Sequence, residues 1–244
     1  MTKRTVAIIQ ARLGSSRLPG KVLLDICGQP MIARVINRVR MATTADDVVI
    51  ATSTDHADDP LVAMCHRYDW PCYRGSLSDV LDRFYRTADA YDADYVIRVS
   101  ADCPLIDPDV TDRVARTVID SAGRCEYAAN MLPPRTFPRG VDVEAFTMAA
   151  LRRTWQDARD ESCREHVTPW IYRNPDRFHI VPVTNDTDES DHRWTVDTPE
   201  DLEMVRTIFR HFRNREFRWK EVAAACRQHP EWVRLNAHVQ QRAA

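Results

Sequence analysis

The chain has 244 residues, of which 44% are hydrophobic, which is enough for one large α/β domain that spans residues 1–244. Its formal net charge of −2 gives no global cationic field, so we expect no nucleic-acid partner. The seven cysteines form no C-x-x-C pair and no apolar run approaches the roughly 20 residues that span a bilayer, so we expect a reduced, cytoplasmic protein without membrane insertion.

The first predicted element is a strand over residues 6–10, which leads directly into a Gly/Ser loop over residues 12–21. Three cations lie in this loop: Arg12, Arg17 and Lys21. Its glycines free backbone N–H groups for an anion, and ligands of open α/β sheets collect outside the carboxyl ends of strands, so the loop predicts a triphosphate site. The alternative is a basic surface loop. The P-loop fingerprint is excluded because Val22 follows Lys21 where Ser or Thr is required, and G-x-G-x-x-G is absent.

Short apolar runs then alternate with amphipathic segments, which is typical of a three-layer α/β/α sandwich with a mostly parallel central sheet. Strands are expected over residues 48–51, 72–74 and 95–99. The two best helices each have one apolar face, formed in the first by Met31, Ile32, Val35, Ile36 and Val39 and in the second by Val80, Leu81, Phe84, Tyr85, Ala88 and Tyr91.

The pattern becomes irregular in the middle of the chain, where three prolines precede a strand-like run over residues 141–146. We therefore expect a small inserted arm over about residues 125–175. Within and after it, a helix is expected over residues 155–173 with a break at Pro169, and a strand over residues 178–184.

The best-defined helix start lies near the C-terminal third of the chain. Thr198 is the expected N-cap, Pro199 the first helical residue and Asp201 the acid three residues after the cap. The expected buried face consists of Leu202, Val205, Ile208, Phe209 and Phe212. A tail over about residues 217–244 is predicted to be helical and then frayed.

Two acids stand where strands are expected to end. Asp102 follows the strand over residues 95–99, and Asp197 follows a strand-like run over residues 194–196. Carboxylates at these points can meet over a bound triphosphate and hold Mg²⁺, which is normally bound by one or two carboxylates together with phosphate oxygens and water. The alternatives are structural: Asp102 lies in a turn, and Asp197 helps to cap its helix.

A mixture of anion-binding, hydroxyl-binding and flat apolar residues predicts the pocket for a second substrate of sugar type. The candidates are Arg139, Asp142, Glu144, His166, Arg193 and Trp194. Each has a plain alternative. Glu144 alternates with apolar neighbours as an exposed strand residue does, His166 fits a helix surface, and Trp194 fits a core.

Six ordered motifs carry a resemblance to a known family over about residues 4–212. They are QARLGSSRLPGK at 10–21, RGS at 74–76 with DVLDR at 79–83, ADCPLI at 101–106, PRGVDVE at 138–144, REHVTP at 164–169 and RWTVD at 193–197. On these motifs the chain resembles the acylneuraminate and 3-deoxy-manno-octulosonate cytidylyltransferases. The most similar branch is that of the spore-coat polysaccharide biosynthesis protein F.

The resemblance implies a glycosyltransferase-A-like nucleotidyltransferase fold, CTP as donor, Mg²⁺ dependence and release of pyrophosphate. It implies catalytic roles for Arg12, Lys21, Asp102 and Asp197, with Asp102 and Asp197 as metal ligands. The implied nucleotide-binding residues are Ala11, Arg12, Gly14, Ser15, Ser16, Arg17, Lys21, Arg74, Ser76, Arg83 and Asp102. The segment over residues 133–146 resembles the region through which family members pair, so we expect a homodimer that buries Val141, Val143 and Phe146.

The expected function is therefore that of a cytidylyltransferase in surface polysaccharide or glycoconjugate biosynthesis. Gln10 stands where the sugar-acid enzymes usually carry Pro, so the acceptor is left open among a sugar acid, a sugar phosphate and a related compound. Two other functions stay open: a glycosyltransferase that uses a nucleotide-sugar, and a non-catalytic nucleotide-binding protein.

Overall fold

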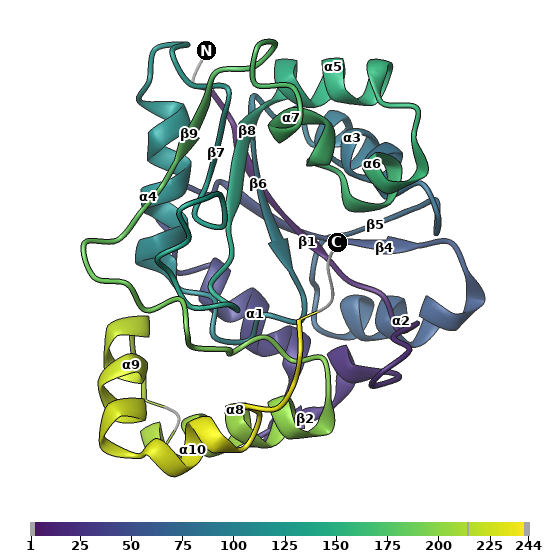
Figure 1. Ribbon diagram of the computed structural model, residues 1–244. Helices are drawn as coiled ribbons and strands as arrows, with labels where there is room; N and C mark the ends of the chain where they lie inside the picture. Colours follow the sequence, from purple (N-terminus) through teal and green to yellow (C-terminus); the bar gives the residue numbers. More distant parts are fainter. Residues whose placement is uncertain (1–2, 214, 242–244) are drawn as a thin grey trace.

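A central sheet organises the protein, as the computed structural model in Figure 1 shows for residues 3–213 and 215–241. Within these residues seven strands pair in the order β5-β4-β1-β6-β8-β7-β9. β1, β4, β5 and β6 are mutually parallel, β8 runs antiparallel to both β6 and β7, and β9 is parallel to β7. The bounds are β1 Thr5–Gln10, β4 Asp47–Ser53, β5 Cys72–Gly75, β6 Tyr95–Ser100, β7 Tyr127–Ala129, β8 Glu144–Thr147 and β9 Ile180–Pro182.

Helices cover both faces of this sheet, which confirms the three-layer sandwich expected from the sequence. A short separate ribbon pairs β2 (Asp25–Ile26) with β3 (Gln29–Pro30). The α-helices are α1 Met31–Val39, α2 Asp59–Arg67, α3 Val80–Ala90, α4 Pro108–Ile119, α5 Met148–Asp157, α6 Glu161–His166, α7 Pro169–Tyr172, α8 Pro199–Phe212, α9 Trp219–Gln228 and α10 Pro230–Arg234. The described residues also form two 3₁₀ turns, η1 Lys21–Leu23 and η2 His56–Asp58. None of these helices is long and apolar enough to cross a bilayer.

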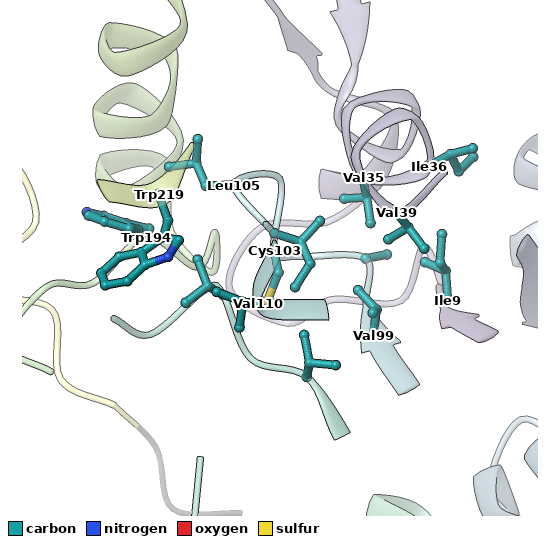
Figure 2. Packing of buried hydrophobic residues seen from close by; sticks show 14 of the residues in the cluster. Ile9, Val35, Ile36, Val39, Val99, Cys103, Leu105, Val110, Trp194 and Trp219 are labelled. Carbon is teal, nitrogen blue, oxygen red and sulfur yellow. The ribbon is translucent and has the colours of Figure 1, made fainter. Parts of the chain in front are cut away.

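Successive side chains of a strand point to opposite faces of the sheet, so each strand contributes to the core on both faces. In β1, Ala7 and Ile9 pack in the cluster that contains α1, α4 and α8, whereas Val6 and Ile8 pack in the cluster that contains α3 and α5. Figure 2 shows Ile9 and Val99 of neighbouring strands facing the apolar side of α1. Because both faces are covered, the parallel strands read as continuous apolar runs in the sequence.

The segment expected to form an inserted arm contributes β7 and β8 to the central sheet. β8 returns antiparallel beside β6, and the strand predicted over residues 141–146 begins only at Glu144. The residues expected to bury a two-fold contact, Val141, Val143 and Phe146, are each 0% exposed within the monomer. The homodimer stays a prediction, and it needs a different face.

The helix predicted over residues 155–173 is divided into three, α5, α6 and α7. The side chain of Thr147 caps α5, which therefore begins at Met148, seven residues before the predicted start. Asp160 caps α6 by accepting a hydrogen bond from the Cys163 N–H. The strand predicted over residues 194–196, before Asp197, does not form. Side-chain caps therefore decide where these elements start and stop.

The helix start at Thr198 has the expected geometry. The Thr198 hydroxyl accepts from the Asp201 N–H, the Asp201 carboxylate accepts from the Thr198 N–H, and Pro199 occupies the first helical position. All five residues of the predicted apolar face of α8 are buried. The predicted tail contains α9 and α10, while its last residues, 242–244, lie outside the described residues.

Gly140 allows two distant segments to cross at very close range. The backbone N–H of Arg139 donates to the His192 carbonyl at 2.9 Å, and that of Trp194 donates to the Arg139 carbonyl at 2.7 Å. At Gly140, φ is 103°, and a Cβ atom there would lie 2.5 Å from the backbone nitrogen of Thr195. Only glycine fits this combination of left-handed backbone and backbone contact.

We expect Gly140→Ala to lower the free energy of unfolding by at least about 3 kcal/mol, because strain and a backbone clash add together. Gly123→Ala is the matched control, since Gly123 also has a positive φ, 87°, but nothing lies within 4 Å of the added Cβ. The control should cost only about 1 to 2 kcal/mol. Urea denaturation of both variants measures the difference, and equal losses would show that the crossing tolerates a side chain.

Candidate active site

A cleft of about 540 Å³ opens at the carboxyl ends of β1 and β6, where an open parallel sheet binds ligands. It brings together segments that are far apart in the sequence: the loop after β1, the turn after β6, and parts of the chain near β8, α6 and α8. Its walls include most residues predicted to form the site: Ala11, Arg12, Gly14, Ser15, Ser16, Arg17, Lys21, Asp102, Arg139, Asp142, Glu144, His166 and Asp197.

The Gly/Ser loop folds back on itself and delivers Lys21 to the centre of this cleft. The N–H groups of Ser15 and Gly20 both donate to the carbonyl of Leu13, at 2.8 and 3.0 Å. The N–H of Leu13 in turn donates to the carboxylate of Asp58, which is 1% exposed. Gly20 has a left-handed backbone, with φ 68°, and starts the turn η1 at Lys21. A buried carboxylate thus anchors a loop that would otherwise be mobile.

The ammonium of Lys21 lies between the two acids that the sequence singled out. Lys21 Nζ is 2.9 Å from Asp102 Oδ2, 2.9 Å from Asp197 Oδ1 and 2.8 Å from the Val196 carbonyl oxygen. Burial opposes the charged form, but the two carboxylates outweigh burial and raise the pKa of Lys21 above its ordinary value. Lys21 is therefore fully charged, and it neutralises part of the carboxylate pair.

Two arginines bind the other oxygen of Asp197. Its Oδ2 atom lies 3.0 Å from Arg17 and 2.9 Å from Arg193. Burial favours the neutral acid, but Lys21, Arg17 and Arg193 together hold the pKa of Asp197 below its ordinary value. Asp197 is consequently a fixed negative charge and a weak base.

The two carboxylates converge on one point, which a positive charge occupies. That arrangement fits a small hard cation, because carboxylate oxygens are its preferred protein ligands. Within residues 3–213 and 215–241 no group of three or more His, Cys, Asp or Glu side chains is placed to enclose a metal. Asp102 and Asp197 would therefore supply two ligands, and phosphate oxygens and water the others.

Two residues predicted to line the acceptor pocket have structural roles instead. Trp194 is 0% exposed and packs beside Trp219 and Val110, as Figure 2 shows. It is buried there because the close crossing at Gly140 draws its backbone into the interior. Arg193 does not line the cleft, since its guanidinium bonds Asp197 and both oxygens of Asp201.

The acceptor side of the cleft keeps the other four candidates. Asp142 accepts a hydrogen bond from Arg135 at 2.7 Å, and His166 ends α6 at the edge of the cleft. Glu144 is 2% exposed, so the alternative of an exposed strand residue is wrong. Its carboxylate already accepts hydrogen bonds from three side chains: Arg98 and Thr168, which line the cleft, and the buried Tyr127. Glu144 is therefore a structural acceptor for the floor.

Arg139 differs from these neighbours because its guanidinium forms no ion pair or side-chain hydrogen bond within residues 3–213 and 215–241. Burial and the nearby charge of Arg135 lower the pKa of Arg139; the charge of Asp142 acts in the opposite direction, and Arg193 adds a smaller lowering effect. A half-buried guanidinium repelled by two others is stabilised by an anionic ligand. Arg139 is thus the strongest anion-binding candidate on this side.

The predicted nucleotide-side residues Arg74, Ser76 and Arg83 do not line the cleft. Arg74 donates to the carbonyls of Ser53 and Asp55 and forms an ion pair with Asp59 at 2.8 Å. Arg83 is 0% exposed and donates to the Ser76 carbonyl. These side chains hold the loops after β4 and β5 in place.

Several residues of the site were missed from the sequence. Arg98 lies in the floor and donates to Gln10 and Glu144. A signal for Arg98 existed, because it is the one charged residue inside the apolar run of β6. Asp58 and Gln241 gave no local signal, since their roles arise from contacts across the fold.

Comparison with known proteins places this site in context. A family model described as "Cytidylyltransferase" matches residues 6–227. The spore coat polysaccharide biosynthesis protein SpsF of Bacillus subtilis is 31% identical over 83% of this chain and 85% of the relative. The 3-deoxy-manno-octulosonate cytidylyltransferase of Pelobacter propionicus is 28% identical over 84% of this chain and 96% of the relative.

Solved structures agree with the sequence relatives. A cytidylyltransferase from Leptospira borgpetersenii has a TM-score of 0.91 at 29% identity and covers 100% of both chains. A CMP:2-keto-3-deoxy-manno-octonic acid synthetase complexed with CTP has a TM-score of 0.64 at 22% identity, covers 86% of this chain and 99% of the other, and supports the fold alone. The family match spans the basic loop, Asp102, Arg139 and Asp197, and the chain therefore belongs to the cytidylyltransferase family.

Proposed function

We propose that the protein transfers a cytidylyl group from CTP to an anionic, sugar-type acceptor and releases pyrophosphate, in surface polysaccharide or glycoconjugate biosynthesis. The observation that carries the proposal is the convergence of Asp102 and Asp197 on Lys21 beside the basic loop. Relatives named for spore coat polysaccharide biosynthesis and for 3-deoxy-manno-octulosonate support this class of pathway.

The donor triphosphate fits the basic loop. Arg12 projects there with a side chain that is 42% exposed and has one long ion pair, 3.8 Å to Glu165, so it is available to a phosphate. The hydroxyls of Ser15 and Ser16 add further donors to the same wall. A Mg²⁺ ion held by Asp102 and Asp197 would neutralise charge on the phosphates and leave Lys21 and Arg17 to contact the departing pyrophosphate.

The acceptor is proposed to be an anion for two reasons. Arg139 offers a guanidinium without an ion pair on the acceptor side, which suits a carboxylate or a phosphate. Asp197, which a hydroxyl acceptor would need as a general base, has a lowered pKa and is bonded by three cations. An acceptor that is already ionised needs no such base.

In the proposed reaction, an acceptor oxygen forms a bond to the α-phosphorus while the bond to the oxygen bridging to the β-phosphorus breaks. Pyrophosphate leaves with that electron pair. The protein contributes mainly position and charge: the loop fixes the triphosphate, Arg139 fixes the acceptor, and Lys21 and Arg12 stabilise the negative charge that grows on the leaving group.

The proposal includes a homodimer acting in the cytoplasm. All seven cysteines are free thiols, which supports a reducing compartment. We expect light scattering at micromolar concentration to give twice the chain mass of 28.2 kDa. A mass equal to that of a single chain would contradict the dimer.

We expect Asp102→Asn and Asp197→Asn each to lower the rate of pyrophosphate release by at least about a hundredfold, because removing one of two metal-binding carboxylates costs several kcal/mol of charge stabilisation. The assay uses CTP, Mg²⁺ and a panel of sugar acids and sugar phosphates, with ATP, GTP and UTP as competing donors. Asp89→Asn, an exposed carboxylate on α3, is the control and should behave as wild type. Equal rates with all four donors would contradict the choice of CTP.

We expect Arg139→Ala to raise the KM for the acceptor about 10- to 100-fold and to leave the affinity for CTP near the wild-type value, since a charge-assisted contact contributes about 1.5 to 3 kcal/mol. Lys21→Met should instead weaken CTP binding. Arg40→Ala removes an exposed guanidinium at the end of α1 and serves as control. If calorimetry shows that Arg139→Ala loses CTP affinity as severely as Lys21→Met, the two halves of the cleft are assigned wrongly.

A further inference from the structure

The segment that follows α10 returns to the cleft. Figure 1 shows it, in yellow, rising from α10 toward the end of β6. Gln241 lies in the wall of the cleft, although α10 itself packs against α8 and α9. Asn236 and Gln241 both lie beyond residue 227, where the family match ends.

Two side chains of this segment contact Arg193 and its partner Asp201. Asn236 is 3% exposed, and its Nδ2 donates to Asp201 Oδ1 at 2.8 Å and to the Arg193 carbonyl at 3.0 Å. Gln241 Oε1 accepts from Arg193 Nη1 at 2.5 Å. The segment therefore bonds both the backbone and the side chain of Arg193.

Arg193 connects these two side chains to Asp197, the candidate metal ligand. Its Nη2 donates to Asp197 Oδ2 at 2.9 Å and to Asp201 Oδ2 at 3.0 Å, and its Nε donates to Asp201 Oδ1 at 2.9 Å. Asp201 is 0% exposed and also accepts from the backbone N–H of Asp197 at 3.0 Å. With Gln241 on Nη1, every nitrogen of the guanidinium is engaged, so the orientation of Arg193 is fixed from three sides.

We propose that Asn236 and Gln241, two side chains of the segment that follows α10, belong to the active site as positioning residues that fix the carboxylate of Asp197 through Arg193. This inference rests on the proposed function, because it assigns the segment a task in metal-assisted transfer from CTP. A carboxylate that also faces Lys21 and Arg17 has several competing partners. Because Arg193 holds the Oδ2 atom of Asp197, the Oδ1 atom stays directed toward the point where Asp102 and Asp197 converge on Lys21.

The test compares Gln241→Met, which keeps side-chain length but removes the acceptor, with Gln241→Glu, which restores an acceptor for Arg193. Gln240→Met, an exposed neighbouring change, is the matched control. Since partners of metal ligands typically affect metal affinity or activity by about 10- to 100-fold, we expect Gln241→Met to lower kcat about tenfold. Calorimetry should show that the gain in CTP affinity produced by Mg²⁺ falls by a similar factor, while CTP affinity without metal and the Tm stay unchanged.

Recovery of both readouts in Gln241→Glu, with Gln240→Met equal to wild type, would establish the positioning role. If Gln241→Met matches Gln240→Met in kcat and in the Mg²⁺-dependent affinity, the inference is overturned while the proposed function stands. If the wild-type protein neither binds CTP nor releases pyrophosphate, the proposed function fails and the inference falls with it. The wild-type arm thus separates the two failures.

Discussion

The balance of charge around Asp197 and Asp102 is the interaction on which the site depends. Two carboxylates brought together without a cation would repel each other, and their burial would be costly. Lys21 relieves this repulsion from between the two acids, and Arg17 and Arg193 relieve it further from the other side of Asp197. The same charges that would bind a metal and a triphosphate therefore also stabilise the fold around the site.

This balance explains why the surrounding structure is so heavily anchored. The loop that carries Lys21 is held by Asp58, and the segment that carries Asp197 is held by Asp201 at the start of α8. Both anchors are buried carboxylates that accept hydrogen bonds from backbone N–H groups, so each fixes the backbone directly through a short side chain. Preorganised charges of this kind cost little further reorganisation when a ligand binds.

The sequence predicted the parts of the fold and site that are encoded locally. The alternation of apolar runs and amphipathic helices predicted the layers, and the ends of β1 and β6 predicted Lys21 and Asp102. Asp197 also lies in the cleft, although the strand expected directly before it does not form. The antiparallel return of β8 had no local signal, since a short strand after a proline-rich segment is equally typical of an arm. Trp194 was misplaced for a similar reason: its burial is set by the crossing at Gly140, which no window of neighbouring residues contains.

The crossing at Gly140 also connects the backbones of the two segments that carry Arg139 and Asp197. Arg139 is linked through backbone hydrogen bonds to His192 and Trp194, only three residues before Asp197. The main chain thus sets the spacing between the backbones at Arg139 and Asp197, and the side chains around them can vary without altering that spacing. A fold built this way can exchange one acceptor for another by replacing a few wall residues, while the machinery that handles the nucleotide stays in register.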